Sequence, residues 1–205
     1  LYYVGGDARQ SGIMQGEIVS EVIHADQGLD HNGDGKIQYV LLEGEAGHQD
    51  AIIRTDSVVR TIQGQGIYLE KLSYQFANWN RSQAENKMLQ LIHQYGGDIE
   101  LVLCNNDEMA MGAVDAYEDE GYPLEERPVI FGIDGLDGTL EAVKNGIIQG
   151  TVFNDRQGQA EQIARLATDL FKGNALSGYD FVNERYIFLP YQKVTISNVD
   201  TFMNR

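Results

Sequence analysis

Short apolar segments alternate with longer amphipathic segments along most of this sequence. Apolar segments of strand length occur at residues 2–4, 37–42, 66–74, 100–104, 128–133 and 147–153. Between them, apolar residues recur near a helical period, which predicts helices at 11–25, 50–62, 81–95, 107–120, 136–145 and 155–171. The tail adds extended pieces near 186–189 and 193–196. Repeated strand–helix units with nearly continuous apolar strands predict an α/β fold, in which a parallel sheet has helices on both faces.

Composition narrows the classes of function. The 205 residues, 42% of them hydrophobic, are enough for a real core, and the formal net charge of −16 argues against a nucleic-acid partner and an anionic membrane surface. The sequence has no apolar run long enough for a transmembrane helix. The single cysteine, Cys104, lies in an apolar run and is expected to be a buried small hydrophobe. The chain starts at Leu1 without an initiator Met or a signal peptide, which predicts a processed or truncated piece.

The segment 30–38, Asp-His-Asn-Gly-Asp-Gly-Lys-Ile-Gln, matches the first nine positions of an EF-hand calcium loop. Oxygen-bearing side chains alternate at Asp30, Asn32 and Asp34, and Gln38 follows. Gly35 stands at the position of the sharp turn, and the next residue, Lys36, would offer its backbone carbonyl. The twelfth position is Leu41, so a bidentate carboxylate must come from elsewhere in the chain. The alternative interpretation is a solvated turn rich in Asp, Asn and Gly.

Polar residues follow the strands at the edge where an open parallel sheet binds ligands. They are carboxylates, amides, one arginine, one histidine and one tryptophan: His48, Asp50, Arg54, Trp79, Asn105, Asn106, Asp107, Asp134, Asn154 and Asp155. Such a rim suits an uncharged, hydroxyl-rich ligand with an apolar ring face. Asp50 and Arg54, four residues apart, are expected to pair across a helical turn. Asp107 and Asp155 are expected to be helix N-caps. Trp79 is expected to face the cleft, although a core position is the alternative.

Four stretches make the sequence resemble the periplasmic glucose/galactose-binding proteins of bacterial ABC uptake and chemotaxis. They are the loop 30–38, the segment 47–50 with Arg54, the segment 105–113 (Asn-Asn-Asp-Glu-Met-Ala-Met-Gly-Ala), and the pair 131–134 and 150–155. They occur in family order over the whole chain. The resemblance implies a non-catalytic, extracytoplasmic monosaccharide-binding protein that serves a membrane ABC permease and, as a further partner, a chemoreceptor. A lipid anchor on the full-length protein is left open.

The resemblance also implies the site residues. Sugar hydroxyls would bond to His48, Asp50, Arg54, Asn106, Asp134 and Asn154, and Trp79 would stack on the sugar ring. Calcium would be held by Asp30, Asn32, Asp34, the Lys36 carbonyl, Gln38 and Glu100.

The resemblance further implies a two-lobed organisation, with most of the N-terminal lobe missing. The C-terminal lobe is predicted at 7–152 and 189–205, and a remnant of the N-terminal lobe at 1–6 and 153–188. Hinges are expected near Gly5-Gly6, Asn154 and Leu189. The missing fragment, or a second copy of the chain, is expected as a partner.

Two other classes of function fit less well. The effector-sensing core of a sugar-responsive transcription regulator shares the fold, but the charge of −16 is unfavourable beside DNA. A metal-dependent phosphotransfer enzyme could use Asp30 and Asp34. Such enzymes place their aspartates directly after a buried strand, whereas Asp30 follows a helix.

Overall fold

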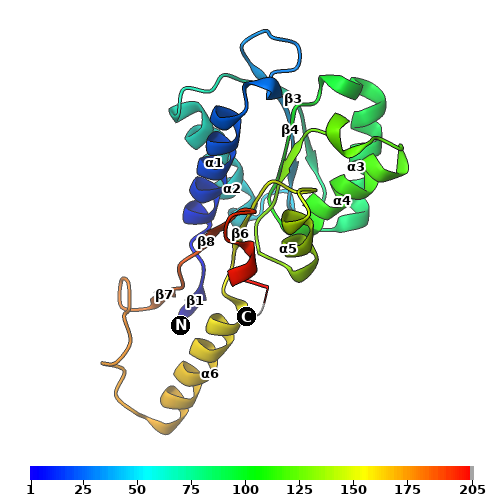
Figure 1. Cartoon of the computed structure of the whole chain (residues 1–205). Coiled ribbons are helices and arrows are strands. Elements are labelled where there is room, and N and C mark those ends of the chain that lie inside the picture. Colours follow the sequence, from blue (N-terminus) through cyan, green and yellow to red (C-terminus); the bar gives the residue numbers. More distant parts are fainter. Residues whose placement is uncertain (204–205) are drawn as a thin grey trace.

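The computed structural model describes residues 1–203 as an α/β molecule with one main sheet (Figure 1). The helices are α1 (Ala8–Ala25), α2 (Gln49–Gly64), α3 (Arg81–Tyr95), α4 (Asp107–Asp119), α5 (Asp137–Lys144) and α6 (Arg156–Lys172). The strands are β1 (Tyr3–Gly5), β2 (Ile37–Glu43), β3 (Leu69–Phe76), β4 (Leu101–Cys104), β5 (Val129–Phe131), β6 (Thr151–Phe153), β7 (Tyr186–Phe188) and β8 (Gln192–Val194). The predicted fold class is confirmed.

The main sheet is parallel, with strand order β3-β2-β4-β5. Single parallel bridges extend it toward β6, which itself pairs antiparallel with β8. This antiparallel pair departs from the purely parallel arrangement that the sequence predicted. The segment between them leaves the main sheet through α6 and β7, and β8 returns beside β6 in the opposite direction.

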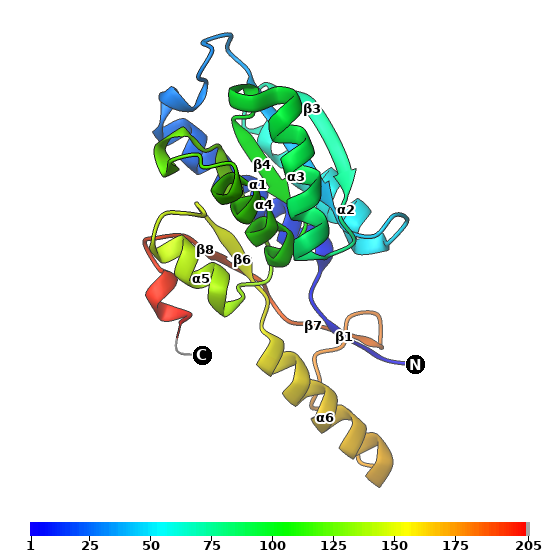
Figure 2. The same ribbon diagram turned by 90° about the vertical axis from the view of Figure 1, so that its right-hand side faces the viewer.

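Helices cover both faces of the sheet because its strands alternate their apolar side chains between two cores. In β2 and β4, Val40, Leu42 and Val102 pack in the core with α3 and α4. Tyr39, Leu41 and other residues of these strands pack in the core with α1 and α2. Figures 1 and 2 show one helix pair on each side of the sheet. The buried Cys104 belongs to the α3–α4 side, as predicted for a small hydrophobe.

A smaller part of the molecule lies away from the main sheet. It contains the two-stranded parallel pair β1–β7 and helix α6, which projects from the body (Figure 2). Large apolar side chains are exposed on α6, namely Ile163, Leu170 and Phe171, the last of them by 92%. The predicted division into two lobes stays a prediction. The last two residues of its C-terminal range, 204–205, lie outside the described residues.

Candidate functional site

The carboxyl ends of β2, β4, β5 and β6 meet at one edge of the sheet, and the predicted polar residues gather there. Helix α2 starts at this edge because His48 caps it: the Nδ1 atom of His48 accepts a hydrogen bond from the amide of Asp50 at 3.2 Å. His48 itself is exposed and half-buried Asp50 follows in the first turn of the helix. Both side chains therefore lie at the rim.

Arg54 is the buried cation of the rim, with only 7% of its surface exposed. Its Nη1 atom donates to the backbone oxygen of Asn105 at 2.7 Å and lies 4.0 Å from Oδ1 of Asp134. Its Nη2 atom donates to Oη of Tyr191 at 3.1 Å. The predicted pairing of Arg54 with Asp50 is wrong, since among residues 1–203 its acidic partner is Asp134. The guanidinium points inward along the sheet edge and not back along its own helix.

Trp79 forms an aromatic wall beside Arg54. The guanidinium carbon of Arg54 lies 5.8 Å from the Trp79 ring centroid, and the His48 ring meets it edge-on at 5.3 Å. The indole covers Gly44, where a Cβ atom would lie 2.2 Å from the ring. Trp79 is half-buried and also packs against the α3–α4 core. It therefore combines the two predicted positions, one facing the rim and one in the core.

The backbone holds Trp79 and Asp134 in unusual conformations. Trp79 has φ +60° and Asp134 has φ +134°, values that non-glycine residues rarely adopt. The amide of Asp134 donates to Val152 O at 2.8 Å, and its carbonyl accepts from the amide of Asn154 at 2.9 Å. Such strain persists only where the surroundings fix it, and it concentrates at binding sites.

Helix α4 begins at the middle of the rim. Its N-cap is Asn106, whose Oδ1 accepts from the amide of Met109 at 3.1 Å. Asp107 is therefore not the N-cap, which corrects the prediction. It is fully buried, and its two oxygens accept from Thr151 Oγ1 at 2.6 Å and the Leu136 amide at 2.8 Å. Asp155, in contrast, caps α6 as predicted, by accepting from the amide of Gly158.

Two carboxyl groups at the rim have raised pKa values. Burial, and then the neighbouring charge of Asp134, raise the pKa of Asp107 to about 7, against the opposing effect of its hydrogen bonds from Thr151 and Leu136. Burial raises the pKa of Asp134 to about 6, although the positive charges of Arg54 and Arg156 oppose the shift. The site therefore contains acids that ionise near neutral pH.

Two residues of this site have roles that the sequence did not predict. Asn105 is buried, accepts from the amide of Gly44 at 3.1 Å and donates to Thr55 at 3.1 Å, so it ties the ends of β2 and β4 to α2. Tyr191 reaches Arg54 from the tail of the chain. Asn105 directly follows a predicted strand, and this position alone indicated that it lies at the rim. For Tyr191, which lies 137 residues from Arg54, the sequence contains no signal.

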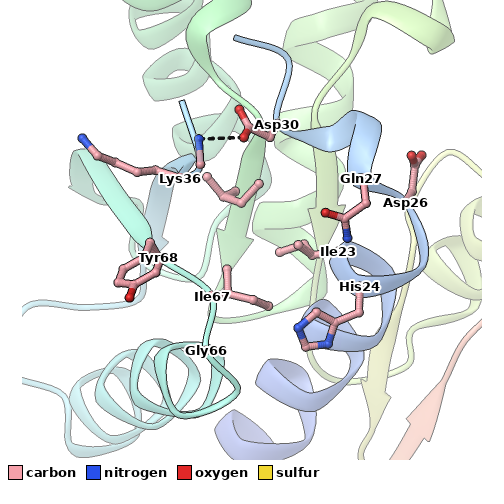
Figure 3. Close-up of a pocket in the computed structure, with 11 residues that line it drawn as sticks. Ile23, His24, Asp26, Gln27, Asp30, Lys36, Gly66, Ile67 and Tyr68 are labelled. Atoms are coloured by element: carbon pink, nitrogen blue, oxygen red, sulfur yellow. Dashed lines mark hydrogen bonds between the residues drawn. The ribbon is translucent and has the colours of Figure 1, made fainter. Parts of the chain in front are cut away.

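The predicted calcium loop lies at the opposite edge of the sheet, before β2. Its own side chains accept from its amides: Asp30 from Gly35 at 2.8 Å, Asn32 from Asp34 at 2.8 Å, and Asp34 from Lys36 at 2.8 Å. Figure 3 shows Asp30 with its hydrogen bond to a loop amide, and the hollow beside it has a volume of about 190 Å³. The hollow is lined by Ile23, His24, Asp26, Gln27, Asp30, Gly35, Lys36, Ile37, Gly66, Ile67 and Tyr68.

Glu100 reaches this loop from a distant part of the chain. It is 1% exposed, and its two oxygens accept from the amides of His31 at 2.6 Å and Gln38 at 2.9 Å. The side-chain oxygen of Gln38 is buried without a hydrogen-bond partner within the described chain, as expected of a group that binds an ion. Within residues 1–203, however, no three His, Cys, Asp or Glu side chains form a group that could hold a metal. The oxygen-bearing side chains of the loop are of the type that calcium prefers. In this structure the loop's own backbone amides hold them by hydrogen bonds.

Comparison with known proteins gives the family. Residues 1–175 match the model described as "Periplasmic binding protein domain". The chain is 37% identical over 205 residues to the D-galactose/methyl-galactoside binding periplasmic protein MglB of Haemophilus influenzae, covering 98% of this chain and 61% of that protein. It is 35% identical over 175 residues to a putative rhizopine-binding protein of Rhizobium meliloti, with 84% and 53% covered.

A solved structure agrees with these relatives. An ABC transporter solute-binding protein from Bacillus halodurans with bound myo-inositol superposes with a TM-score of 0.83 at 29% identity, over 99% of this chain and 63% of that one. The chain thus spans about three fifths or less of the curated relatives' length. These relatives are binding proteins and not enzymes, which agrees with the non-catalytic prediction. In the described part of the chain, no helix is long and apolar enough to cross a membrane. The chain belongs to the periplasmic binding protein family.

Proposed function

We propose that this chain forms one wall of the monosaccharide site in an extracytoplasmic solute-binding protein that serves an ABC permease. The observation that supports this is the rim itself, where Arg54, Asp134 and Asn106 lie beside the Trp79 wall. Charged and amide groups at this edge offer both donors and acceptors to hydroxyl groups, and an aromatic plate covers an apolar ring face. The named relatives bind galactosides, a rhizopine or an inositol, all of them polyhydroxylated.

Within this class we propose D-glucose or D-galactose as the ligand. The direct sugar contacts would come from His48, Asp50, Arg54, Asn106, Asp134 and Asn154, with Trp79 against the ring. A membrane permease, a chemoreceptor and the remainder of the N-terminal lobe are the partners of this proposal.

The experiment uses the single tryptophan as the reporter. The 205-residue chain is titrated with D-galactose, D-glucose, myo-inositol and xylitol while Trp79 emission is recorded, and calorimetry checks each titration. Galactose or glucose should change the emission, and Asp134→Asn should weaken binding more than tenfold because a charged acceptor is lost, a loss of more than about 1.4 kcal/mol. Asp137→Asn, an exposed site on α5, should behave like the parent. Equal titrations for parent and Asp134→Asn would contradict the proposed site.

We also propose that the loop 30–38 binds calcium, closed by Glu100. The proposed ligands all offer oxygen atoms, Gln38 has a buried side-chain oxygen without a partner in the described chain, and the buried Glu100 accepts from amides at both ends of the loop. Calcium would be held by Asp30, Asn32, Asp34, the Lys36 carbonyl, Gln38 and Glu100, and its two positive charges would offset most of the negative charge of the three carboxylates. The metal would have a structural role, since the loop lies at the edge of the sheet away from the rim.

Thermal melting with calcium and with chelator tests this second proposal. Calcium at about 100 times its dissociation constant stabilises a folded chain by about 2.7 kcal/mol, which raises the melting temperature by several degrees at this size. Glu100→Gln should remove most of that increase, whereas the exposed Glu45→Gln should retain it. An undiminished calcium shift in Glu100→Gln would contradict the closure of the site by Glu100.

A further inference from the structure

Two of the chain crossings between the main body and the β1–β7 part lie side by side. The first runs from β1 to α1 through Gly6 and Asp7, and the second runs from β7 to β8 through residues 189–191. The amide of Leu189 donates to the carbonyl of Gly5 at 2.9 Å, so the two crossings are joined where they begin. Figure 1 shows β1 and β7 together below the body. Any rotation between the two parts must pass through these segments.

Tyr191 is fixed to the main body at the end of the second crossing. Its side chain is 5% exposed, and its amide donates to Oε1 of Gln10 on α1 at 3.0 Å. The ring fills the space above Gly6 of the first crossing, where a Cβ atom would lie 2.4 Å from the ring. A single side chain therefore touches both crossings.

The hydroxyl of Tyr191 reaches the ligand-binding rim. It accepts from Nη2 of Arg54 at 3.1 Å, while Nη1 donates to Asn105 O at 2.7 Å and lies 4.0 Å from Asp134. These two bonds hold the guanidinium from two directions, which fixes its plane beside Trp79. Tyr3 lies in the same region, and its own hydroxyl donates to Gly6 O at 3.2 Å.

We propose that Tyr191 is a positioning residue that links the two interlobe crossings to Arg54. It would contact no sugar. Its hydroxyl sets the direction of the Arg54 side chain, and its ring transmits any displacement of Gly6 to that hydroxyl. Bending at the crossings would then change the orientation of a ligand-binding cation. This inference adds a residue to the proposed sugar site, and the role of Tyr191 in sugar binding rests on that proposed function.

The first test needs no sugar, because Trp79 is the single tryptophan and Arg54 lies against it. Tyr191→Phe keeps the ring over Gly6 and removes only the hydroxyl. Gly6→Ala keeps the hydroxyl and displaces the ring, so it provides a second, independent route to the same effect. Both variants should shift the emission maximum of Trp79 and its quenching by acrylamide. The matched control is Tyr95→Phe. It also loses one hydrogen bond, the 3.1 Å bond from the Tyr95 hydroxyl to the Leu72 carbonyl, which lies outside the rim.

The second test is the sugar titration of the same variants. Tyr191→Phe and Gly6→Ala should bind galactose or glucose roughly three- to tenfold more weakly than the parent, because the cation is less well oriented. Tyr95→Phe should bind like the parent. If Tyr191→Phe gives the same Trp79 emission and the same affinity as Tyr95→Phe, the positioning role is wrong. If the parent binds no sugar, the proposed function fails, and the emission comparison still decides whether Tyr191 orients Arg54.

Discussion

At the scale of single residues, the buried carboxyl of Asp107 makes stability depend on pH. Its pKa of about 7 in the folded chain lies above the ordinary 3.8, so the neutral form stabilises the fold. That contribution is fully present below about pH 4 and is lost as the pH rises through about 7. We expect the free energy of unfolding of the parent to fall by about 1–4 kcal/mol over this range.

Asp107→Asn should flatten this pH profile, because an amide does not titrate and its oxygen can still accept from Leu136. Urea unfolding at several pH values between 4 and 8 measures the effect. Asp56→Asn, which changes an exposed carboxylate, should keep the parent's profile. An equally steep profile in Asp107→Asn would show that the ionisation of another group is responsible.

The sequence could predict which kinds of residue lie at the rim, but it could not predict which residue each of them contacts. Asn106 and Asp107 are adjacent and both can cap a helix, so only the fold decides that Asn106 caps α4 while Asp107 is buried under β6. Arg54 was assigned to Asp50 from helical spacing, yet its acidic neighbour is Asp134, which lies beyond the end of β5. Contacts between distant segments, such as those of Tyr191, leave no local pattern to read.

At the scale of elements, the close packing of α3 against α4 depends on a glycine, because any side chain there would collide with the neighbouring helix. At Gly112 of α4, a Cβ atom would lie 2.2 Å from the carbonyl oxygen of Arg81 on α3. Backbone atoms cannot move aside cheaply, so Gly112→Ala should separate the helix pair and destabilise the chain by about 1–3 kcal/mol. Gly138→Ala on α5 meets nothing within 4 Å and should be neutral or stabilising by up to about 1 kcal/mol. Chemical denaturation of both variants gives the comparison, and similar losses would contradict the packing argument.

Helices were predicted more accurately than strands. The predicted helix 81–95 agrees with α3 at both ends, since Asn80 caps it through the amide of Gln83 and Gly96 follows its last residue. The strand predicted at 66–74 occurs at 69–76. An edge strand with alternating exposure has no sharp apolar boundary, and its register is set by pairing with β2.

At the scale of the whole molecule, a single wall should bind sugar weakly. Small sugars obtain affinity from many directional hydrogen bonds and from stacking on both faces, and this chain supplies one stacking tryptophan. We expect the 205-residue chain alone to bind glucose or galactose in the millimolar range. A separate N-terminal fragment of the family type should tighten binding and cover the exposed α6 face with Leu170 and Phe171.

Calorimetry measures the sugar affinity of the chain with and without the fragment, and sedimentation measures its oligomeric state. The exposed apolar face of α6 also predicts self-association of the chain without that fragment. Micromolar sugar affinity in a monomeric sample free of added fragment would show that the second wall is unnecessary.

The antiparallel pairing of β6 with β8 has a consequence for protein engineering. Phe153 faces Gln192 across that ladder, so the segment between them leaves the body and returns to the place where it left. A short β-hairpin turn could therefore replace this excursion, and a gene starting at Asp7 would omit β1 as well. The product would be a minimal domain with α1 to α5, the main sheet and the loop 30–38.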